Sequence, residues 1–370
     1  RSNRSTSGGK RSGPVSNGAD GPLPTSRPTA GPTPRPPRPR NRAPISDDTV
    51  THMQGDAAHD QSDRTRRYDT VLVPTDGSEH ARAGARHGVR IANGFDATVH
   101  AVHVTDTGAG LTPVELSQTT SAGDERRDDG QEALDSVAHL GDESGVTVRT
   151  ELLEGNPAEL LQSYLTDNNI DIVAMGTRGR SNIERHLLGS VTDRMVRTSP
   201  VPVLTARIEN DPALPVEGDY TDILLPTRGG DGSELAVDHA VSIAARFGAT
   251  LHVIYVVDVR SQAAKHDTYE LGELVDELRT TVTDAVTDRA DEAGIDTRVA
   301  IQQGTPHSAI QRYAADHEID LIIMGTHGRG RVEQFLLGSI TERTVRTADV
   351  PVITVRLDEW FGADGGGKGY

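Results

Sequence analysis

Cysteine is absent from this 370-residue sequence, and aromatic residues make up only 3% of it. Without cysteine the chain can form no disulfide, no thiolate metal site and no cysteine nucleophile. Long apolar runs are missing too: residues 319–324, one of the longest, fall far short of the roughly 20 residues that a membrane-spanning helix needs. The sequence therefore predicts a soluble protein, which we expect in the cytoplasm and not in a membrane.

Lysine is scarce, with three residues against 35 arginines, whereas acidic residues are abundant. The net charge is −17, and because residues 1–67 carry +6, the rest of the chain carries −23. An acidic body of this strength disfavours nucleic acid as the main partner. Strong acidity with little lysine resembles proteins of salt-loving archaea, where molar salt screens repulsion beyond roughly 3 Å. We expect a haloarchaeal protein; a GC-rich genome that favours arginine codons is the alternative.

The first 67 residues form a basic arm rich in Pro, Ser and Arg. Residues 1–45 have almost no apolar side chain larger than valine. Such a segment buries too little surface to offset the entropy of ordering, so the arm is predicted to be disordered. Its arginines between residues 35 and 42 could bind an acidic surface or a nucleic acid. A solvated tail without a binding role is the preferred interpretation.

The remainder of the chain is an internal duplication. YDTVLVPT at residues 68–75 matches YTDILLPT at residues 220–227, an offset of 152, and residues 87–104 match residues 239–256 at the same offset. Residues 155–207 match residues 304–356 at an offset of 149, with about half the positions identical. We therefore expect two domains, at residues 68–208 and 220–357, with a linker at 209–219 and a flexible tail at 358–370.

Each repeat alternates apolar strands with helical segments. In the first repeat, strands are expected at residues 70–74, 97–104, 146–153, 170–175 and 201–205, with helices between them. Asn156 before Pro157 predicts a helix start, with asparagine as the cap and proline at the first helical position. Five strands alternating with four helices predict an α/β fold with a parallel sheet covered on both faces. Such sheets bind ligands beyond the carboxyl ends of their strands.

A long glycine motif follows the fourth strand of each repeat. Gly176 and Gly179 are separated by nine residues from Gly189-Ser190, and the second repeat has the same spacing, ending at Gly338-Ser339. Glycine lets backbone N–H groups approach an anion closely, and a helix that begins at serine offers free first-turn N–H groups. Arginines in both loops favour an anionic ligand. The glycines could instead serve only tight turns. Neither a Walker P-loop nor a GxGxxG motif is present.

The sequence PTDGS at residues 74–78, the His-Val pair at 103–104 and the long glycine motif resemble the ATP-binding class of universal stress proteins (UspA-like). The resemblance covers residues 68–207 and 220–356. It implies two tandem doubly wound domains with five-stranded parallel sheets, of the adenine nucleotide alpha hydrolase-like, Rossmann-like kind. It also implies ATP as the ligand, with AMP or ADP as related possibilities and Mg accompanying the nucleotide.

The resemblance assigns site residues position by position. In the first repeat the adenosine part would contact Pro74, Thr75, Asp76, Val104 and Met175. Ribose and phosphates would contact Gly176, Arg178, Gly179, Gly189, Ser190 and Val191. The matching positions of the second repeat are Pro226, Thr227, Val256, Met324, Gly325, His327, Gly328, Gly338, Ser339 and Ile340.

One departure of the second repeat from the pattern bears on the nucleotide. Arg228 stands where the first repeat has Asp76, so the carboxylate expected near the nucleoside is missing. Asp231 follows three residues later and would replace it only in a rebuilt loop. We therefore expect the first site to bind ATP more tightly than the second.

Three functions remain open at this point. The first is a nucleotide-binding regulatory module of the stress response, acting on an unidentified protein partner. The second is a slow Mg-dependent ATPase, with Asp76 near the metal. The third is an interaction module with empty pockets, for example one associated with a transporter. No catalytic or metal site is predicted, because the 14 histidines lack metal-ligand spacing and His100 and His252 are expected on strand faces. In the family the last strand pairs across a two-fold axis, which implies an intrachain pseudo-dimer; further homodimerisation stays open.

Overall fold

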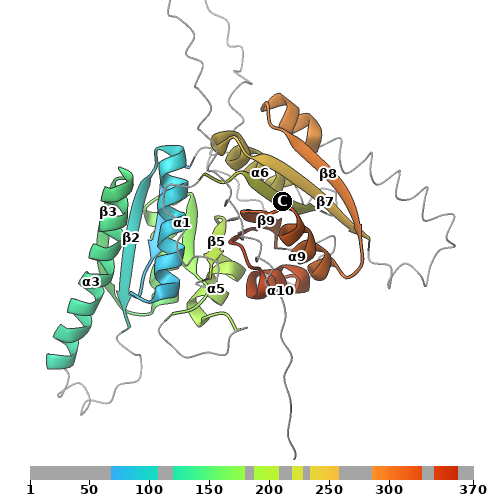
Figure 1. The fold of residues 1–370 in the computed structure, drawn as a ribbon. Helices are drawn as coiled ribbons and strands as arrows, with labels where there is room; N and C mark the ends of the chain where they lie inside the picture. The colour runs from blue at the N-terminus through green and yellow to red at the C-terminus, as the bar shows by residue number, and fades with distance from the viewer. Residues whose placement is uncertain are drawn as a thin grey trace, which may run out of the picture. The chain divides into compact units, whose positions relative to one another are not determined.

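A computed structural model describes residues 68–106, 120–179, 187–207, 219–227, 234–257, 286–326 and 337–356. Figure 1 shows how these elements are arranged. The predicted basic arm, the C-terminal tail and nearly all of the predicted linker lie outside the described residues. So do the loop arginines Arg180, Arg185, Arg329 and Arg331.

The first repeat folds as the predicted alternation of strands and helices. Its elements are β1 (Thr70–Pro74), α1 (Glu79–Phe95), β2 (Thr98–Thr105), α3 (Thr120–Ser144), β3 (Val148–Glu154), α4 (Pro157–Asp167), β4 (Ile172–Gly176), α5 (Ser190–Thr198) and β5 (Val203–Ala206). The predicted cap of α4 is confirmed, because Asn156 Oδ1 accepts hydrogen bonds from the backbone N–H groups of Ala158 and Glu159 at 3.1 and 3.3 Å. Pro157 fits the first turn because it has no N–H to leave unpaired.

The second repeat forms the same alternation. Its elements are β6 (Asp222–Thr227), α6 (Glu234–Phe247), β7 (Thr250–Val257), β8 (Thr297–Gln303), α9 (Pro306–Asp316), β9 (Leu321–Gly325), α10 (Ser339–Thr347) and β10 (Val352–Val355). Residues 258–285, between β7 and β8, lie outside the described residues, and residues 286–292 are helical. Where it is described, the fold therefore follows the duplication of the sequence.

The strands form one ten-stranded sheet in the order β3-β2-β1-β4-β5-β10-β9-β6-β7-β8. Neighbouring strands are parallel except at the centre, where β5 and β10 are antiparallel. Val352 lies opposite Thr205 and Thr354 lies opposite Val203, so the predicted intrachain pseudo-dimer is confirmed. In each half the first strand lies between the second and the fourth. The strand order thus reverses at β1/β4 and at β6/β9, where α/β sheets bind their ligands.

Helices cover both faces of the sheet, as the doubly wound class requires. Residues of α1, α3 and α6 pack with the strands into one hydrophobic cluster that spans both halves. On the opposite face, α4 and α5 pack into a cluster of the first half, and α9 and α10 pack into a separate cluster of the second half. The buried core is therefore continuous on one face and divided on the other.

Candidate functional site

A cavity of about 250 Å³ lies beyond the carboxyl ends of β1 and β4. All eleven site residues predicted in the first repeat line this cavity. They are Pro74, Thr75, Asp76, Val104, Met175, Gly176, Arg178, Gly179, Gly189, Ser190 and Val191. Residues that are up to 117 positions apart in the sequence thus meet at the point where the strand order reverses.

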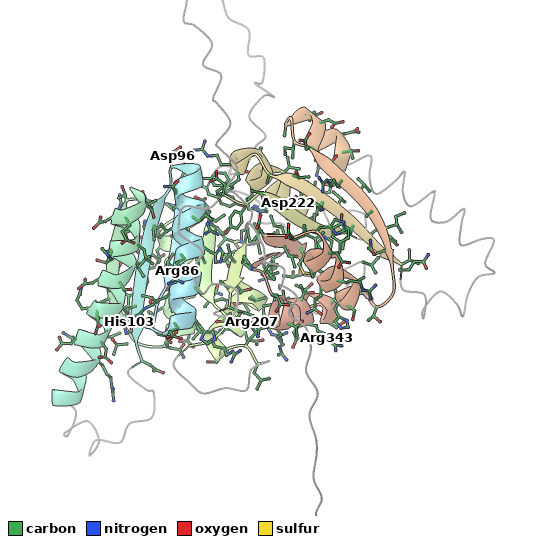
Figure 2. The ribbon with its side chains drawn as sticks, in the orientation of Figure 1. Arg86, Asp96, His103, Arg207, Asp222 and Arg343 are labelled. Carbon is green, nitrogen blue, oxygen red and sulfur yellow. The ribbon has the colours of Figure 1, made fainter. Side chains whose placement is uncertain are left out.

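The turn after β1 holds Asp76 at the cavity wall. The Thr75 N–H donates to the carbonyl oxygen of Val102 on β2, and Nδ1 of His103 lies 2.9 Å from the Thr75 carbonyl oxygen (His103 is labelled in Figure 2). The Ser78 N–H donates to Oδ1 of Asp76 at 3.0 Å. The turn itself thus supplies one hydrogen bond that orients the carboxylate.

Two glycines after β4 are required by close backbone approach. A Cβ atom at Gly176 would lie 2.3 Å from the carbonyl oxygen of His80 on α1, so no larger residue fits. A Cβ at Gly179 would lie 2.4 Å from Oδ2 of Asp76. The glycine loop therefore passes directly beside the carboxylate, and the two halves of the site are in contact.

The glycine loop is closed at its base by two hydrogen bonds. The Gly189 N–H donates to the carbonyl oxygen of Thr177 at 2.9 Å, and Oγ1 of Thr192 donates to the carbonyl oxygen of Gly176 at 2.9 Å. These bonds leave the next residues of the chain, Ser190 and Val191, at the cavity wall. The loop thus delivers the start of α5 to the cavity.

The amino terminus of α5 differs from those of α1 and α4. Helix α1 is capped by the Ser78 hydroxyl and α4 by the Asn156 carbonyl oxygen, whereas α5 begins after Gly189 with no side-chain cap. The first N–H groups of a helix have no partner within the helix, and the helix dipole adds a partial positive charge there. The uncapped end at Ser190 is a suitable contact for an anion.

The rest of the cavity is apolar. Val102, Leu161 and Met175 are members of the hydrophobic cluster under α4 and α5, and Val104 and Val191 pack against it. The sequence-based prediction missed five lining residues, namely Ala81, Val102, Pro157, Leu161 and Thr192. Of these five, only Pro157 could have been predicted from the sequence. The helix start at Asn156 comes just after the carboxyl end of β3, and ligands bind at the carboxyl ends of the strands.

The second repeat places its predicted residues in the same way where they are described. Pro226 and Thr227 end β6, Val256 lies in β7, Met324 and Gly325 end β9, and Gly338, Ser339 and Ile340 start α10. The loop base is again closed, by Gly338 N–H to Thr326 O at 2.8 Å and by Thr341 Oγ1 to Gly325 O at 2.9 Å. Helix α10 also has no side-chain cap. His327, Gly328 and the departing Arg228 lie outside the described residues.

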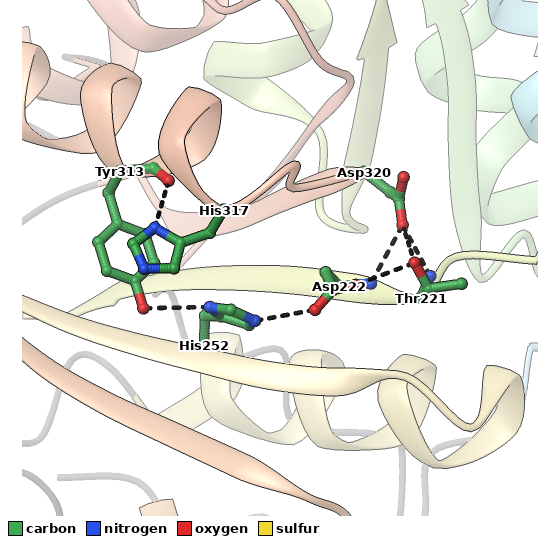
Figure 3. Close-up of polar contacts among 6 residues, drawn as sticks. All are labelled: Thr221, Asp222, His252, Tyr313, His317 and Asp320. Carbon is green, nitrogen blue, oxygen red and sulfur yellow. Dashed lines mark hydrogen bonds and ion pairs between the residues drawn. The ribbon is translucent and has the colours of Figure 1, made fainter. Parts of the chain in front are cut away.

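A separate polar cluster lies at the amino-terminal end of the second half of the sheet (Figure 3). His252 is buried; its Nε2 lies 3.0 Å from Oδ1 of Asp222, and its Nδ1 lies 3.1 Å from the hydroxyl of Tyr313. The ring of Tyr313 stacks on that of His317, with 3.9 Å between the ring centroids. Burial lowers the pKa of His252 below its ordinary value of 6.5, while the Asp222 hydrogen bond acts in the opposite direction. Asp222 opens β6, so this cluster lies at the opposite edge from the glycine loop.

The first repeat holds a simpler version of this cluster. Nδ1 of His100 lies 3.1 Å from the hydroxyl of Tyr164, and Thr70 occupies the position of Asp222. Burial raises the pKa of Tyr164 to about 12 and lowers the pKa of His100. Both histidines lie in buried strands, as the sequence predicted, and neither contributes to the cavity lining.

Residues 67–207 and 219–356 each match the profile of the Universal stress protein family. The chain belongs to the universal stress protein family. Two matched regions account for most of the sequence, so the duplication seen in the motifs is a tandem of two family domains.

Individual relatives agree with this assignment. Universal stress protein MJ0531 of Methanocaldococcus jannaschii is 38% identical over 142 residues, which is 38% of this chain and 82% of the relative. Universal stress protein Rv2005c of Mycobacterium tuberculosis is 26% identical over 302 residues, covering 79% of this chain and 99% of the relative. The crystal structure of a universal stress protein from Archaeoglobus fulgidus covers 79% of this chain and all of that chain, with a TM-score of 0.60 and 23% identity. The tandem fold is therefore shared with solved members of the family.

Within the described residues, no helix is both long enough and apolar enough to cross a bilayer. In the same residues, no group of three or more His, Asp or Glu side chains is arranged to hold a metal ion.

Proposed function

We propose that the cavity of the first domain binds ATP, and that the protein is a nucleotide-binding regulatory module of the stress response. The observation that carries the proposal is the convergence of a glycine loop, an uncapped helix start and an apolar wall on one cavity. An adenosine group requires apolar surface with a few polar contacts, and a phosphate chain requires backbone N–H groups. The cavity supplies both, side by side.

The charge around the cavity also favours a phosphate. The chain carries −23 outside its first 67 residues, yet the cavity lining includes Arg178 and the positive end of the α5 dipole. A cation placed in an acidic body supports an anionic ligand. If Mg accompanies the nucleotide, the Asp76 carboxylate and the Thr75 hydroxyl are oxygen donors of the kind that it prefers.

The lining favours binding over rapid hydrolysis. Among the described residues that line the cavity there is neither histidine nor lysine, and Asp76 is the one carboxylate. Rapid phosphoryl transfer needs a group that positions the attacking water and cations that neutralise the developing charge. The proposal therefore gives the nucleotide a regulatory role, with slow Mg-dependent hydrolysis as the second function to be tested.

The proposed function also implies a location in the cell. An ATP-binding regulator works where ATP is held, so we infer a cytoplasmic location. The scarcity of lysine and the acidic body support a salt-rich cytoplasm of the haloarchaeal kind.

Native mass spectrometry of the purified full chain, followed by calorimetric titration with ATP, ADP and AMP, tests the proposal. We expect co-purified or titratable adenine nucleotide in the wild type, and binding at least about tenfold weaker in Gly179→Val, because the added side chain meets Asp76. Gly145→Asn is the matched control, since Gly145 has a positive φ of 67°, lies outside the cavity and has nothing within 4 Å of an added Cβ. Bound ADP with phosphate release would support turnover. A wild type that binds none of the three nucleotides would leave the interaction module as the function.

A further inference from the structure

Two leucines are exchanged between the domains at the glycine loops. Leu188 directly precedes Gly189 in the first domain, and Leu337 directly precedes Gly338 in the second. Both are buried, at 8% and 6% exposure, but each belongs to the hydrophobic cluster of the opposite domain. Each glycine loop is therefore anchored in the other domain's core.

Leu337 packs into the cluster that walls the first cavity. The cluster that it joins includes Val102, Leu161 and Met175, which line the cavity, and Val191 packs against it. The second domain thus contributes a side chain behind the proposed adenosine wall of the first. Removing that side chain would leave a void in the cluster, and the residues that line the cavity could move into it.

Leu188 makes the reciprocal contact. It belongs to the cluster of the second domain with Leu224, Ile310 and Met324, and Ile340 of the α10 start packs against the same cluster. Met324 and Ile340 are the counterparts of Met175 and Val191 in the first domain. The exchange is therefore symmetric: each glycine-loop site is packed against one leucine from the other domain.

Polar contacts hold the two uncapped helices to one another. Arg197 of α5 pairs with Glu342 of α10 at 3.5 Å. Nη1 of Arg207 donates to the carbonyl oxygen of Arg346 at 2.7 Å, and Nη1 of Arg356 donates to that of Thr198 at 2.9 Å (Arg207 is labelled in Figure 2). Together with the β5/β10 pairing, these contacts make α5 and α10 one connected unit.

We propose that Leu337 is a positioning residue for the cavity of the first domain, that Leu188 is the corresponding residue for the glycine-loop site of the second domain, and that through them occupation of one nucleotide site strengthens binding at the other. The inference rests on the proposed ATP function. A nucleotide that packs against Val102, Leu161 and Met175 contacts the cluster that holds Leu337. Binding therefore favours the position of Leu337, and of the adjoining start of α10, that suits binding in the second domain. By thermodynamic linkage the effect is reciprocal.

The test is hydrogen exchange with mass spectrometry on the full chain during an ATP titration. Peptides around Met175–Gly179 report the first cavity alone. In Leu337→Ala, the ATP concentration that half-protects these peptides should rise about five- to tenfold, although no residue of the first domain has changed. Leu337→Met, which keeps the volume, should restore the wild-type value.

Leu134→Ala is the control for a general loss of stability. Leu134 of α3 is also buried, but it belongs to the cluster on the opposite face of the sheet and lies outside the cavity. It should lower the unfolding temperature without moving the first-cavity titration. An unchanged titration in Leu337→Ala, or an equal shift in Leu134→Ala, would overturn the coupling while leaving nucleotide binding intact. Absence of ATP protection in the wild type would instead refute the proposed function itself.

Discussion

The hydroxyl of Tyr220 lies 2.9 Å from Nδ1 of His87, a residue of the opposite domain. The relationship is reciprocal, because the hydroxyl of Tyr68 makes the equivalent hydrogen bond to Nδ1 of His239. All four side chains are buried. Buried polar groups are costly without partners, so these two pairs align the domains in one arrangement and disfavour shifted ones.

Removing one hydroxyl should show what this alignment contributes. Tyr220→Phe removes the buried hydrogen bond between Tyr220 and His87, so we expect the free energy of unfolding to fall by about 0.5–1.5 kcal/mol. The ring contact of Tyr220 with Phe247, at 5.1 Å between centroids, is kept in the variant. Chemical denaturation followed by circular dichroism measures the change.

The half-buried Tyr255 of β7 offers a matched control. Tyr255→Phe makes the same chemical change at a partly exposed position and should alter stability by less than about 0.5 kcal/mol. Equal losses in the two variants would contradict a special role for the junction pair.

The two proposed nucleotide sites should differ in affinity. Gly179→Val should remove the tighter binding event and Gly328→Val the weaker one, because Arg228 replaces the carboxylate that Asp76 supplies in the first domain. Calorimetric titration of both variants with ATP gives the two affinities. A larger loss of affinity from Gly328→Val than from Gly179→Val would show the ranking to be wrong.

Acid should destabilise the protein through His252. Its pKa is lowered in the folded state, chiefly by burial, so the unfolded chain binds the proton more readily. The stabilising contribution is complete above pH 6.5 and is lost as the pH falls from there through the lowered pKa. His252→Gln should flatten the dependence of unfolding free energy on pH between about 7 and 5, by at most about 1.4 kcal/mol per pH unit.

An exposed histidine provides the comparison for this measurement. The His139 side chain of α3 is 74% exposed and pairs with Glu143 on the helix surface. His139→Gln makes the same chemical change on the surface of the protein, and a flattening confined to His252→Gln would assign the effect to the buried histidine. A wild-type slope retained in His252→Gln would mean that other groups govern acid sensitivity.

Salt should stabilise the folded chain. A net charge of −23 outside the first 67 residues creates repulsion that ions screen, with a Debye length falling from about 10 Å at 0.1 M to about 3 Å at 1 M. We expect the unfolding temperature to rise by at least a few degrees over that range of KCl. An uncharged osmolyte at matched osmolarity is the control, and an equal rise in both solutions would argue against screening.

The duplication made much of the fold predictable, because two copies of one pattern report the same structure. Strand β1 spans the predicted residues 70–74, and the Asn156 cap is where the motif placed it. The cavity lining was predictable where glycine spacing marked it, at Gly176 and Gly189. The place of Val102 in the lining was not predictable. A strand buried on both faces has no alternation of polar and apolar residues to show which side chains face the ligand.

The exchanged leucines illustrate what a sequence pattern leaves out. Leu187-Leu188 and Leu336-Leu337 are ordinary apolar pairs next to a glycine, and nothing local indicates that their partners lie in the other domain. The same holds for Tyr68 and His239, which are 171 positions apart. Such contacts depend on the placement of whole domains, which only the assembled structure provides.

The central antiparallel pair consists of two strands of four residues each. Between separate molecules, the pairing of two such strands would depend on the concentration of the protein. Here both strands belong to one polypeptide, so each meets the other at a fixed effective concentration set by the connecting chain and not by the abundance of the protein. The paired arrangement of the two domains is therefore expected to persist at low protein concentration.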